Sequence, residues 1–205
     1  MSTIQITQSD LQASLPDTTS DFQIDHIRNE ISIARDIHGI PHVTGSNSYD
    51  AFFGQGFATA QDRLWHMEFD RRKAFGRWAE LVGEPGLESD ITMRKFQIED
   101  SVIDDLTHLN SQTLLMLTAY SDGVNSFIRS TSSLPVEYKL TNSKPEPWSL
   151  KDCLAVYKVR HIMMGVFEGK YWRAQLLNNL GPDRTADLLK GYQPGHLLIV
   201  PPLDT

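Results

Sequence analysis

The chain has 205 residues, of which 40% are hydrophobic and 22% are charged, a composition typical of a globular protein that buries one sizeable core. Its formal net charge of −7, with no basic run longer than Arg71-Arg72-Lys73, disfavours nucleic-acid binding, which needs a basic patch to contact the phosphates. Cys153 is the single cysteine, so the chain can form no internal disulfide and shows no sign of a thiolate metal site.

The beginning of the chain is polar and poor in aromatic residues. It predicts an N-terminal arm over residues 1–21, either loose or with a short helix around Ser9–Leu15. We expect residues 22–205 to form a single domain in which order begins near Phe22. No segment resembles a signal peptide or approaches the ~20 apolar residues of a membrane span. As written, the sequence predicts a cytoplasmic protein with no membrane partner, and a periplasmic or secreted one if a signal peptide was removed before Met1.

The first regular elements predicted are a β-hairpin and a long helix. Ile31–Arg35 alternates apolar and polar residues, Gly39 and Pro41 mark a turn, and residues 41–44 resume in extended form. From Tyr49 onward, apolar residues recur at steps of three and four, the spacing of a stripe along an amphipathic helix. The stripe consists of Phe53, Phe57, Ala60, Leu64 and Met67. This helix should be long and buried along one side.

Two further helices and a terminal strand complete the predicted fold. Asn110 or the residue after it can cap one helix, and Ser149 followed by Asp152 resembles a capping box that opens another. Residues 130–147, rich in Ser, Thr, Pro and Asn, indicate a long connection, and the apolar run Leu197–Val200 indicates a strand. The helix after Asn110 carries the stripe Leu114, Leu117, Val124 and Ile128. We therefore expect a mostly helical fold with strands at the two ends of the chain.

Charged residues continue the apolar stripe of the long helix. One step beyond Met67 the stripe reaches Arg71, and a guanidinium buried there needs a charged partner. Glu68 lies three residues before Arg71 and four before Arg72, the spacing of side chains that share a helix face. Asp62 lies two turns before Arg71 and supplies a second carboxylate. We expect these four residues to form a buried structural network, although spacing alone leaves a solvated charged face and a catalytic acid–base pair open.

Several separated motifs follow one another between Ile31 and Asp152. They are ISIARDIHGIPHV, YDAFFGQGFATAQDRLWHMEFDRRKAFGRWAELVG, YSDGVNSF, and LPVEYKL with PEPWSLKD. Their key residues are Arg35-Asp36 with Gly39, Pro41 and His42, then Gln61-Asp62-Arg63 with Met67-Glu68 and Arg71-Arg72, then Asp122-Gly123 with Asn125. In this order the motifs resemble the α subunit of the penicillin acylase family of N-terminal-nucleophile (Ntn) hydrolases. No single motif would suffice.

The resemblance implies a precursor that cuts itself into a shorter α chain and a longer β chain. The new N-terminal Ser, Thr or Cys of β is then the nucleophile, and its own α-amine, with a reference pKa near ~7.7–8.0, accepts the proton. The chain itself would carry no catalytic residue and would complete an αββα Ntn-hydrolase fold with the β subunit, in a heterodimer or a higher oligomer. The implied substrate is a small N-acylated molecule of the β-lactam, acyl-amino-acid or acyl-homoserine-lactone type. The tail, residues 196–205, would end where autoproteolysis released it.

The resemblance also implies that the segment VRHIMMGVFEGKYW supplies one wall of an acyl pocket. The positions that match the family's acyl-contacting residues are His161, Met163, Met164 and Phe167. Two adjacent methionines with a phenylalanine suit an adaptable apolar pocket, and the alternative is that they are ordinary core residues. Arg160, Glu168 and Lys170 could instead recognise a polar or charged acyl end.

Many members of the family bind a calcium ion with an α-chain glutamate just beyond this segment. The matching positions here are Lys170 or Tyr171, or Gln175 under another gap, and none of them carries a carboxylate. No metal ligand or required cofactor is therefore expected from this chain, and Glu168 is the nearby carboxylate that a structural calcium ion would use.

Two other classes of protein compete with this interpretation. A noncatalytic helical binding or scaffold protein would fit the lack of a complete catalytic triad, an HExxH motif or a P-loop. A metal hydrolase would use some of the histidines, although they are scattered without the spacing of metal ligands. These histidines are His26, His38, His42, His66, His108, His161 and His196.

Overall fold

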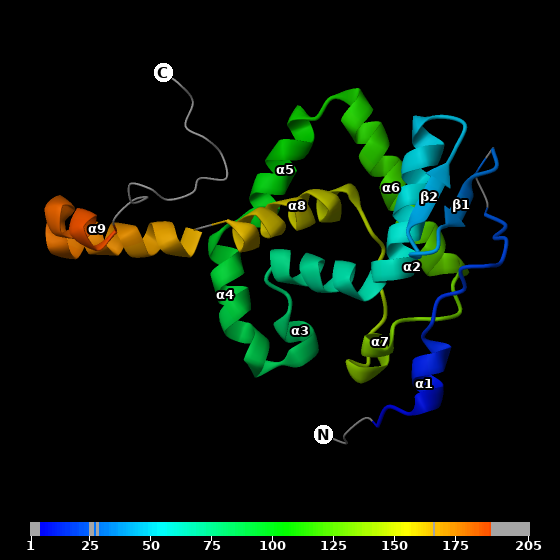
Figure 1. Ribbon diagram of the computed structural model, residues 1–205, viewed down its shortest axis with the longest axis horizontal. Coiled ribbons are helices and arrows are strands. Elements are labelled where there is room, and N and C mark those ends of the chain that lie inside the picture. The colour runs from blue at the N-terminus through cyan, green and yellow to red at the C-terminus, as the bar shows by residue number, and fades with distance from the viewer. Residues whose placement is uncertain (1–4, 25–26, 28, 166, 190–205) are drawn as a thin grey trace. The chain divides into compact units, whose positions relative to one another are not determined.

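The computed structural model describes residues 5–24, 27, 29–165 and 167–189 (Figure 1). The chain divides into two compact units, residues 1–161 and 162–205, which are taken separately below. This boundary falls near the end of a helix and differs from the one expected at residue 21. The strand expected at Leu197–Val200 lies outside the described residues.

The chain begins with a capped helix followed by a hairpin. Helix α1 (Gln8–Ala13) starts with a capping box in which the side chain of Thr7 accepts from the backbone N–H of Asp10 at 3.2 Å. Strands β1 (Ser32–Arg35) and β2 (Pro41–Thr44) pair in antiparallel fashion. Gly39, at φ 75°, occupies the left-handed conformation that the turn between them requires. The hairpin predicted from the sequence is confirmed.

The long helix predicted after Tyr49 is also confirmed, as α2 (Ser48–Ala74). Its N-cap is Asn47, whose side-chain oxygen accepts from the backbone N–H of Asp50 at 3.0 Å. At Arg63 the backbone leaves helical geometry, with φ −137°, so α2 consists of two segments joined by a kink. The first segment packs against the hairpin and the second carries most of the buried charged residues.

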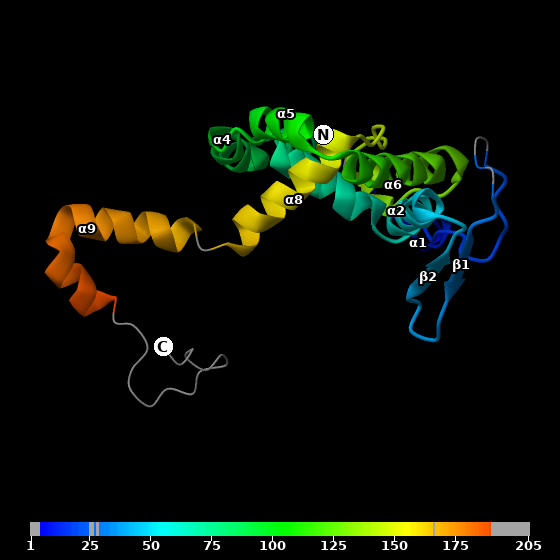
Figure 2. The same ribbon diagram turned by 90° about the horizontal axis from the view of Figure 1, so that it is seen from above.

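Helix α6 (Ser111–Ser130), capped by Asn110 as predicted, lies beside α2 (Figure 2). Two glycines let the backbones approach closely. A Cβ atom added to Gly123 would lie 2.0 Å from the carbonyl oxygen of Phe53, and one added to Gly56 would lie 2.0 Å from that of Tyr120. The contact between these two helices is therefore backbone against backbone, and no larger residue fits at either position.

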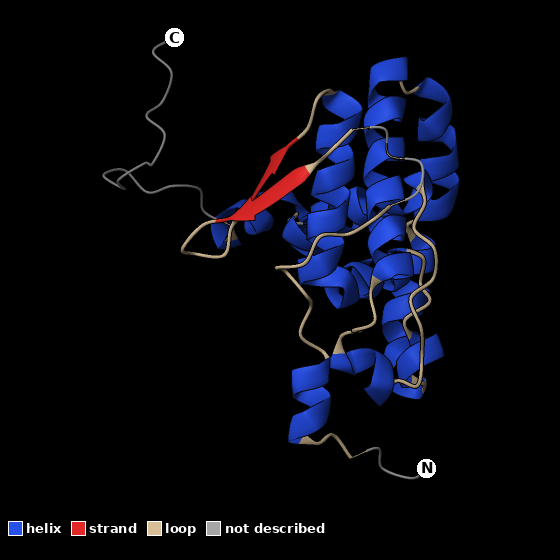
Figure 3. Ribbon diagram, turned by 90° about the vertical axis from the view of Figure 1, so that its right-hand side faces the viewer, coloured by secondary structure: helices blue, strands red, loops and turns tan. Residues whose placement is uncertain are grey.

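Helices fill the rest of the first unit, as the blue ribbons of Figure 3 show. The short helices between α2 and α6 are α3 (Ala79–Val82), the 3₁₀ turn η1 (Glu84–Gly86), α4 (Leu87–Lys95) and α5 (Ile98–His108). The connection expected over residues 130–147 contains one short helix, α7 (Val136–Leu140). Helix α8 (Leu150–Met164) follows Ser149, whose backbone N–H donates to Asp152 at 2.7 Å, as the capping-box prediction requires.

The second unit contains helix α9 (Phe167–Leu188), which bends at Gly181, where φ is 76°, just before Pro182. Proline lacks an N–H and cannot continue the ladder, which accounts for the break. Among the described residues, no helix combines the length and the apolarity that a membrane crossing requires. The mostly helical fold with few strands is confirmed for the described part of the chain.

The core of the first unit lies between α2, α6 and the residues around α7. It is formed by Phe57, Ala60, Leu64, Met67, Val124, Phe127, Tyr138 and Trp148. The N-terminal residues cover one side of it, because the ring of Phe22 packs edge-on against Phe57 at 5.2 Å. Gln61 also donates to the carbonyl of Asp17 at 2.5 Å. The arm is thus held against the unit, and of the two forms expected for it, loose or with a short helix around Ser9–Leu15, the structure has the helix, as α1.

Candidate functional site

Glu68 is the centre of a buried ion network at the C-terminal end of α2. Its side chain is only 3% exposed. One carboxylate oxygen, Oε1, accepts from Arg72 Nε at 2.5 Å, and the other accepts from Arg71 Nη2. Both arginines are buried as well. The structure therefore brings together Glu68, Arg71 and Arg72, as the sequence predicted.

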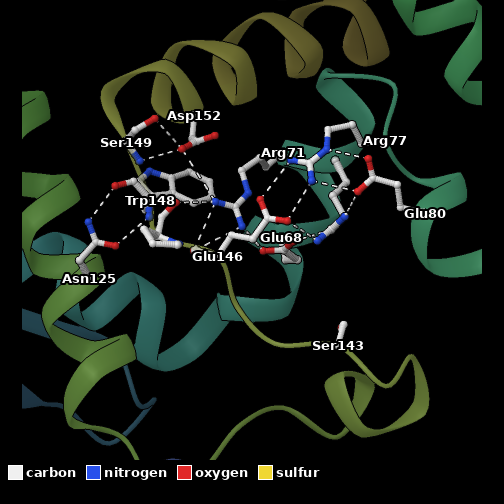
Figure 4. A network of polar contacts seen from close by, with 12 residues as sticks. Glu68, Arg71, Arg77, Glu80, Asn125, Ser143, Glu146, Trp148, Ser149 and Asp152 are labelled. Atoms are coloured by element: carbon white, nitrogen blue, oxygen red, sulfur yellow. Dashed lines mark hydrogen bonds and ion pairs between the residues drawn. The ribbon is translucent and has the colours of Figure 1, made fainter.

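The network continues outward through two further carboxylates, as Figure 4 shows. Arg72 donates to Glu80 at 2.7 Å and to Glu146 at 2.8 Å. Arg77 contacts the same two carboxylates at 2.9 Å each. Because Glu80 and Glu146 are 49% and 39% exposed, this outer layer lies at the surface while Glu68 lies inside. The positive and negative charges alternate from core to solvent.

Arg71 joins α2 to the segment that precedes α8. Its guanidinium donates to the carbonyl of Pro147 at 2.9 Å and lies over the ring of Trp148, 5.2 Å from the centroid. The same segment is held from the other side by Asn125 of α6. The amide of Asn125 donates to the carbonyl of Trp148 and accepts from its N–H, both at 2.7 Å (Figure 4). The start of α8 is thus fixed by both long helices.

The electrostatics of the network agree with a structural role. Hydrogen bonds from Arg77 lower the pKa values of Glu80 and Glu146, and bonds to those carboxylates raise the pKa of Arg77. Burial raises the pKa of Tyr138, which packs beside Glu68. These shifts favour the charged forms of Glu80, Glu146 and Arg77 and the neutral form of Tyr138, which are the forms already present at neutral pH.

Asp62 does not join this network. Its carboxylate pairs with Arg35 of β1, at 2.8 Å from Nη2 and 3.1 Å from Nη1. Arg35 Nη2 also donates to Gln61 at 2.6 Å. The expectation that Asp62 is a partner of Arg71 is therefore corrected, because nine residues of helix make about 2.5 turns, which puts the two side chains on opposite faces and about 13.5 Å apart along the axis. Asp62 instead ties the hairpin to the first segment of α2.

The residues predicted to form an acyl-pocket wall lie at the end of α8 and the start of α9. His161 is exposed, with its Nδ1 3.0 Å from the carbonyl oxygen of Tyr157 and its ring centroid 4.4 Å from that of Tyr157. Met163 and Met164 are 43% and 82% exposed, so the alternative that they are core residues of this chain is wrong. Phe167 is half-buried. Which molecule the four side chains contact stays a prediction.

Arg160, suggested as a reader of charged acyl groups, is already paired. Its Nε and Nη2 donate to Asp70 Oδ2 of α2, at 2.9 and 2.5 Å. Glu168 is exposed. In the part of the chain that the structure describes, no three His, Cys, Asp or Glu side chains come together as a metal site would require. The hollows described, of about 620 and 420 Å³, are lined by other residues of the first unit.

Sequence reasoning missed the residues that complete these contacts. They are Asp70, Arg77, Glu80 and Glu146, whereas Arg35 and Arg160 were singled out for other reasons, as part of a motif and for recognition of a charged acyl end. Arg77 and Glu80 carried a usable signal, since opposite charges three residues apart pair on a helix. The remaining pairs join residues far apart in the sequence, where spacing carries no information about contact.

The comparison with protein-family models matches residues 30–195 to the family described as Penicillin amidase. The chain belongs to the penicillin amidase family. The predicted resemblance is therefore confirmed. Among curated relatives, the penicillin acylase 2 proenzyme of Pseudomonas sp. (strain SE83) is 38% identical over 192 residues, which cover 94% of this chain and 25% of that protein. The acyl-homoserine lactone acylase QuiP of Pseudomonas aeruginosa is 28% identical over 90% of this chain and 22% of its own length.

A solved member of the penicillin amidase family has the same fold. The thermostable penicillin G acylase from Alcaligenes faecalis superposes with a TM-score of 0.65 at 25% identity, covering 84% of this chain and 97% of that chain. The chain spans a quarter or less of the length of the two curated relatives above. Both curated relatives are named as acylases.

Proposed function

We propose that this chain is the α subunit of an acylase that matures by autoproteolysis and uses an N-terminal nucleophile on a β subunit. The observation that carries the proposal is a contrast of coverage. The chain matches 97% of one chain of the Alcaligenes faecalis enzyme but only 25% of the Pseudomonas proenzyme. A stretch that is a separate chain in one relative and a quarter of a proenzyme in another supports a subunit cut from a precursor.

The chemistry available on the described residues supports a nucleophile located elsewhere. Burial raises the pKa of the Cys153 thiol, which accepts a hydrogen bond from Trp148 Nε1 at 3.2 Å and is not poised to attack a carbonyl. An N-terminal Ser, Thr or Cys on the β subunit would use its own α-amine as the base, and donors around it would stabilise the oxyanion. This mechanism needs no cofactor.

The substrates proposed are small N-acylated molecules. The relatives are named for penicillin and for acyl-homoserine lactones, which share an acyl group on an amide nitrogen and differ in the leaving amine. We assign to His161, Met163, Met164 and Phe167 the role of contacting the acyl group. The two exposed methionines favour this assignment because flexible thioether side chains adapt to acyl groups of different shape.

The β subunit is also the partner proposed for the apolar side chains that α9 leaves exposed. Clustered large apolar residues on a surface mark an interaction site. On α9 they are Tyr171, Trp172, Leu177, Leu180 and Leu188. Together the subunits would complete an αββα Ntn-hydrolase fold, in a heterodimer or a higher oligomer, to which this chain contributes the helices and the hairpin.

The test is to express the full-length gene product that contains this chain, separate its subunits and assay both. We expect two chains by mass spectrometry, with Ser, Thr or Cys at the new N-terminus of the second. Hydrolysis of penicillin G or N-acyl-homoserine lactones should require both chains. Comparable turnover by the isolated 205-residue chain would overturn the proposal. A single uncut product that binds N-acyl ligands without hydrolysing them would favour the noncatalytic binding protein instead.

A further inference from the structure

A second buried carboxylate of α2, separate from the ion network, holds the last turns of α8. Asp70 is 3% exposed, and its Oδ2 accepts both hydrogen bonds from Arg160. His66, one turn earlier on α2, accepts from Arg160 Nη2 through its Nε2, which lies 3.5 Å from the same oxygen of Asp70. Arg160 therefore donates hydrogen bonds to two side chains of α2 that lie 90 residues or more before it in the sequence.

This pair is poorly built for stability alone. The other carboxylate oxygen of Asp70, Oδ1, is buried without a hydrogen-bond partner among the described residues. Glu68, by contrast, uses both of its oxygens on buried arginines. A buried carboxylate that engages only one oxygen recovers less of its desolvation cost, and such a group calls for an explanation other than stability.

The position of Arg160 suggests what the pair does. Arg160 immediately precedes His161, the first of the residues to which the proposed function assigns acyl contact. Its guanidinium is 37% exposed, yet its charge is matched by Asp70, so it is a fixed anchor and not a free cation awaiting a carboxylate. An anchor at this point fixes the part of α8 from which His161, Met163 and Met164 project.

We propose that Asp70 is a positioning residue, which acts through Arg160 to hold the C-terminal turn of α8 and thereby sets the preference of the enzyme for acyl groups. The inference rests on the proposed function for the identity of the substrate. The anchor itself, the contact between Asp70 of α2 and Arg160 of α8, does not depend on the proposed function. A misplacement of about 1 Å at a substrate-contacting residue is enough to cost up to ~100-fold in rate, so loss of the anchor should be visible in kinetics.

The experiment compares variants of the full-length, matured enzyme. Asp70→Asn and Arg160→Gln remove the ion pair, the double variant removes both charges together, and Arg160→Lys keeps the charge. A matched control is Lys158→Gln, on the same helix two residues earlier. Lys158 donates to Ser101 of α5 at 2.5 Å and pairs with Asp105 at 2.7 Å. Lys158→Gln therefore removes an ion pair of α8 that does not involve Asp70.

Two readouts separate positioning from mere stability. The first is amide hydrogen exchange in peptides covering residues 158–164, which should become ~10-fold faster in Asp70→Asn and remain unchanged in Lys158→Gln. The second is kcat and KM over acyl groups of increasing length. The ratio of kcat/KM between short and long acyl groups should shift ~10-fold in Asp70→Asn, mainly through KM, and Arg160→Lys should retain most of the original ratio.

The outcomes are distinct. Uniform loss of activity on all acyl groups in proportion to a lowered Tm, or unchanged exchange over 158–164, would overturn the inference. If Asp70→Asn does not fold, the double variant, which removes both charges together, provides the same comparison, and Arg160→Lys remains the variant expected to retain the original ratio. If the wild-type enzyme hydrolyses no N-acyl substrate, the proposed function fails and the preference with it, while the exchange measurement still tests the anchor on its own.

Discussion

Arg72 Nη2 lies 2.8 Å from Glu146 Oε1, which joins α2 to a residue 74 positions later in the chain. The same guanidinium also donates to the buried Glu68 through Nε, so Arg72 bridges an exposed carboxylate and a buried one. Charge on the surface is thus linked to charge in the core through one side chain. Substitution of the buried carboxylate and substitution of an exposed one should therefore change the stability of the protein by different amounts.

Glu68→Gln should be strongly destabilising. The substitution removes the buried carboxylate that Arg71 and Arg72 share, and breaking a buried ion pair in this way costs about 3–5 kcal/mol. We expect a lower Tm or impaired maturation of the full-length enzyme. Any enzyme that matures should keep its nucleophile chemistry.

Glu80→Gln is the matched control for this substitution, because Glu80 contacts Arg72 from the exposed side of the same network. Surface pairs contribute about 0–1 kcal/mol, so the Tm should change little. If Glu68→Gln instead matured fully, melted normally and lost turnover, Glu68 would have a catalytic role and the structural assignment would be wrong.

The outer carboxylates should make stability depend on pH on the acid side. The pKa of Glu146 is lowered in the folded chain from its ordinary value of 4.5, chiefly by hydrogen bonds from Arg77. A lowered folded pKa contributes stability that is present above the unfolded pKa and lost as pH falls through the folded one. Glu146→Gln should therefore lower Tm near neutral pH, and its Tm should converge with that of the wild type as pH falls below 4.5.

Thermal melting of both proteins across this acid range measures the effect. Because Glu146 is 39% exposed, solvent screening keeps the difference small, and a Tm shift of a few degrees is expected. A Tm difference that stays constant from neutral to acid pH would show that lost packing, and not the charge of Glu146, explains the variant.

Gly123→Ala should disrupt the contact between α2 and α6. The added methyl group would lie 2.0 Å from the carbonyl oxygen of Phe53, so the two backbones would have to separate. Overpacking of this kind costs about 1–3 kcal/mol or more. Gly169→Ala in α9 is the control, since nothing lies within 4 Å of its added Cβ. Because alanine favours helices over glycine by about 1 kcal/mol, that variant should be neutral or slightly stabilised in urea unfolding.

Trimming the proposed pocket wall should alter acyl preference without a matching loss of stability. Met164 is 82% exposed, so Met164→Ala removes little packing within the chain. In the matured enzyme, Met164→Ala and Phe167→Ala should each change the ratio of kcat/KM between short and long acyl substrates by ~10-fold. The measurement is a kinetic series on both variants alongside their Tm values. Equal losses on all substrates that track a lower Tm would contradict the assignment.

Sequence patterns predicted the helices whose formation depends on interactions between residues close together in the sequence. The stripe from Phe53 to Met67 and the caps at Asn110 and Ser149 identified α2, α6 and α8, because periodicity and capping depend on neighbours within one or two turns. The helices between residues 79 and 108 were missed, since each is short and they are joined by bends such as Gln97, at φ 51°.

The candidate site divides in the same way. Glu68 and its arginines were predicted because they share one helix face. Asp62 was assigned to the wrong partner, since side chains nine residues apart on a regular helix lie on opposite faces. Tertiary packing brings Arg72 to Glu146 and Asp70 to Arg160. No local sequence pattern around these residues predicts either pair.

The distance along the chain between Asp70 and its partner also has a consequence for biosynthesis. Arg160 is made 90 residues after Asp70, and at ribosomal rates of about 5–20 residues per second this takes roughly 5–20 s. During that interval Asp70 lacks Arg160, whereas Glu68 can already pair with Arg71 and Arg72 of its own helix. A translational pause between residues 74 and 150 would therefore lengthen the time for which Asp70, buried in the folded unit, lacks its partner, and with it the exposure of α2 to aggregation and proteolysis.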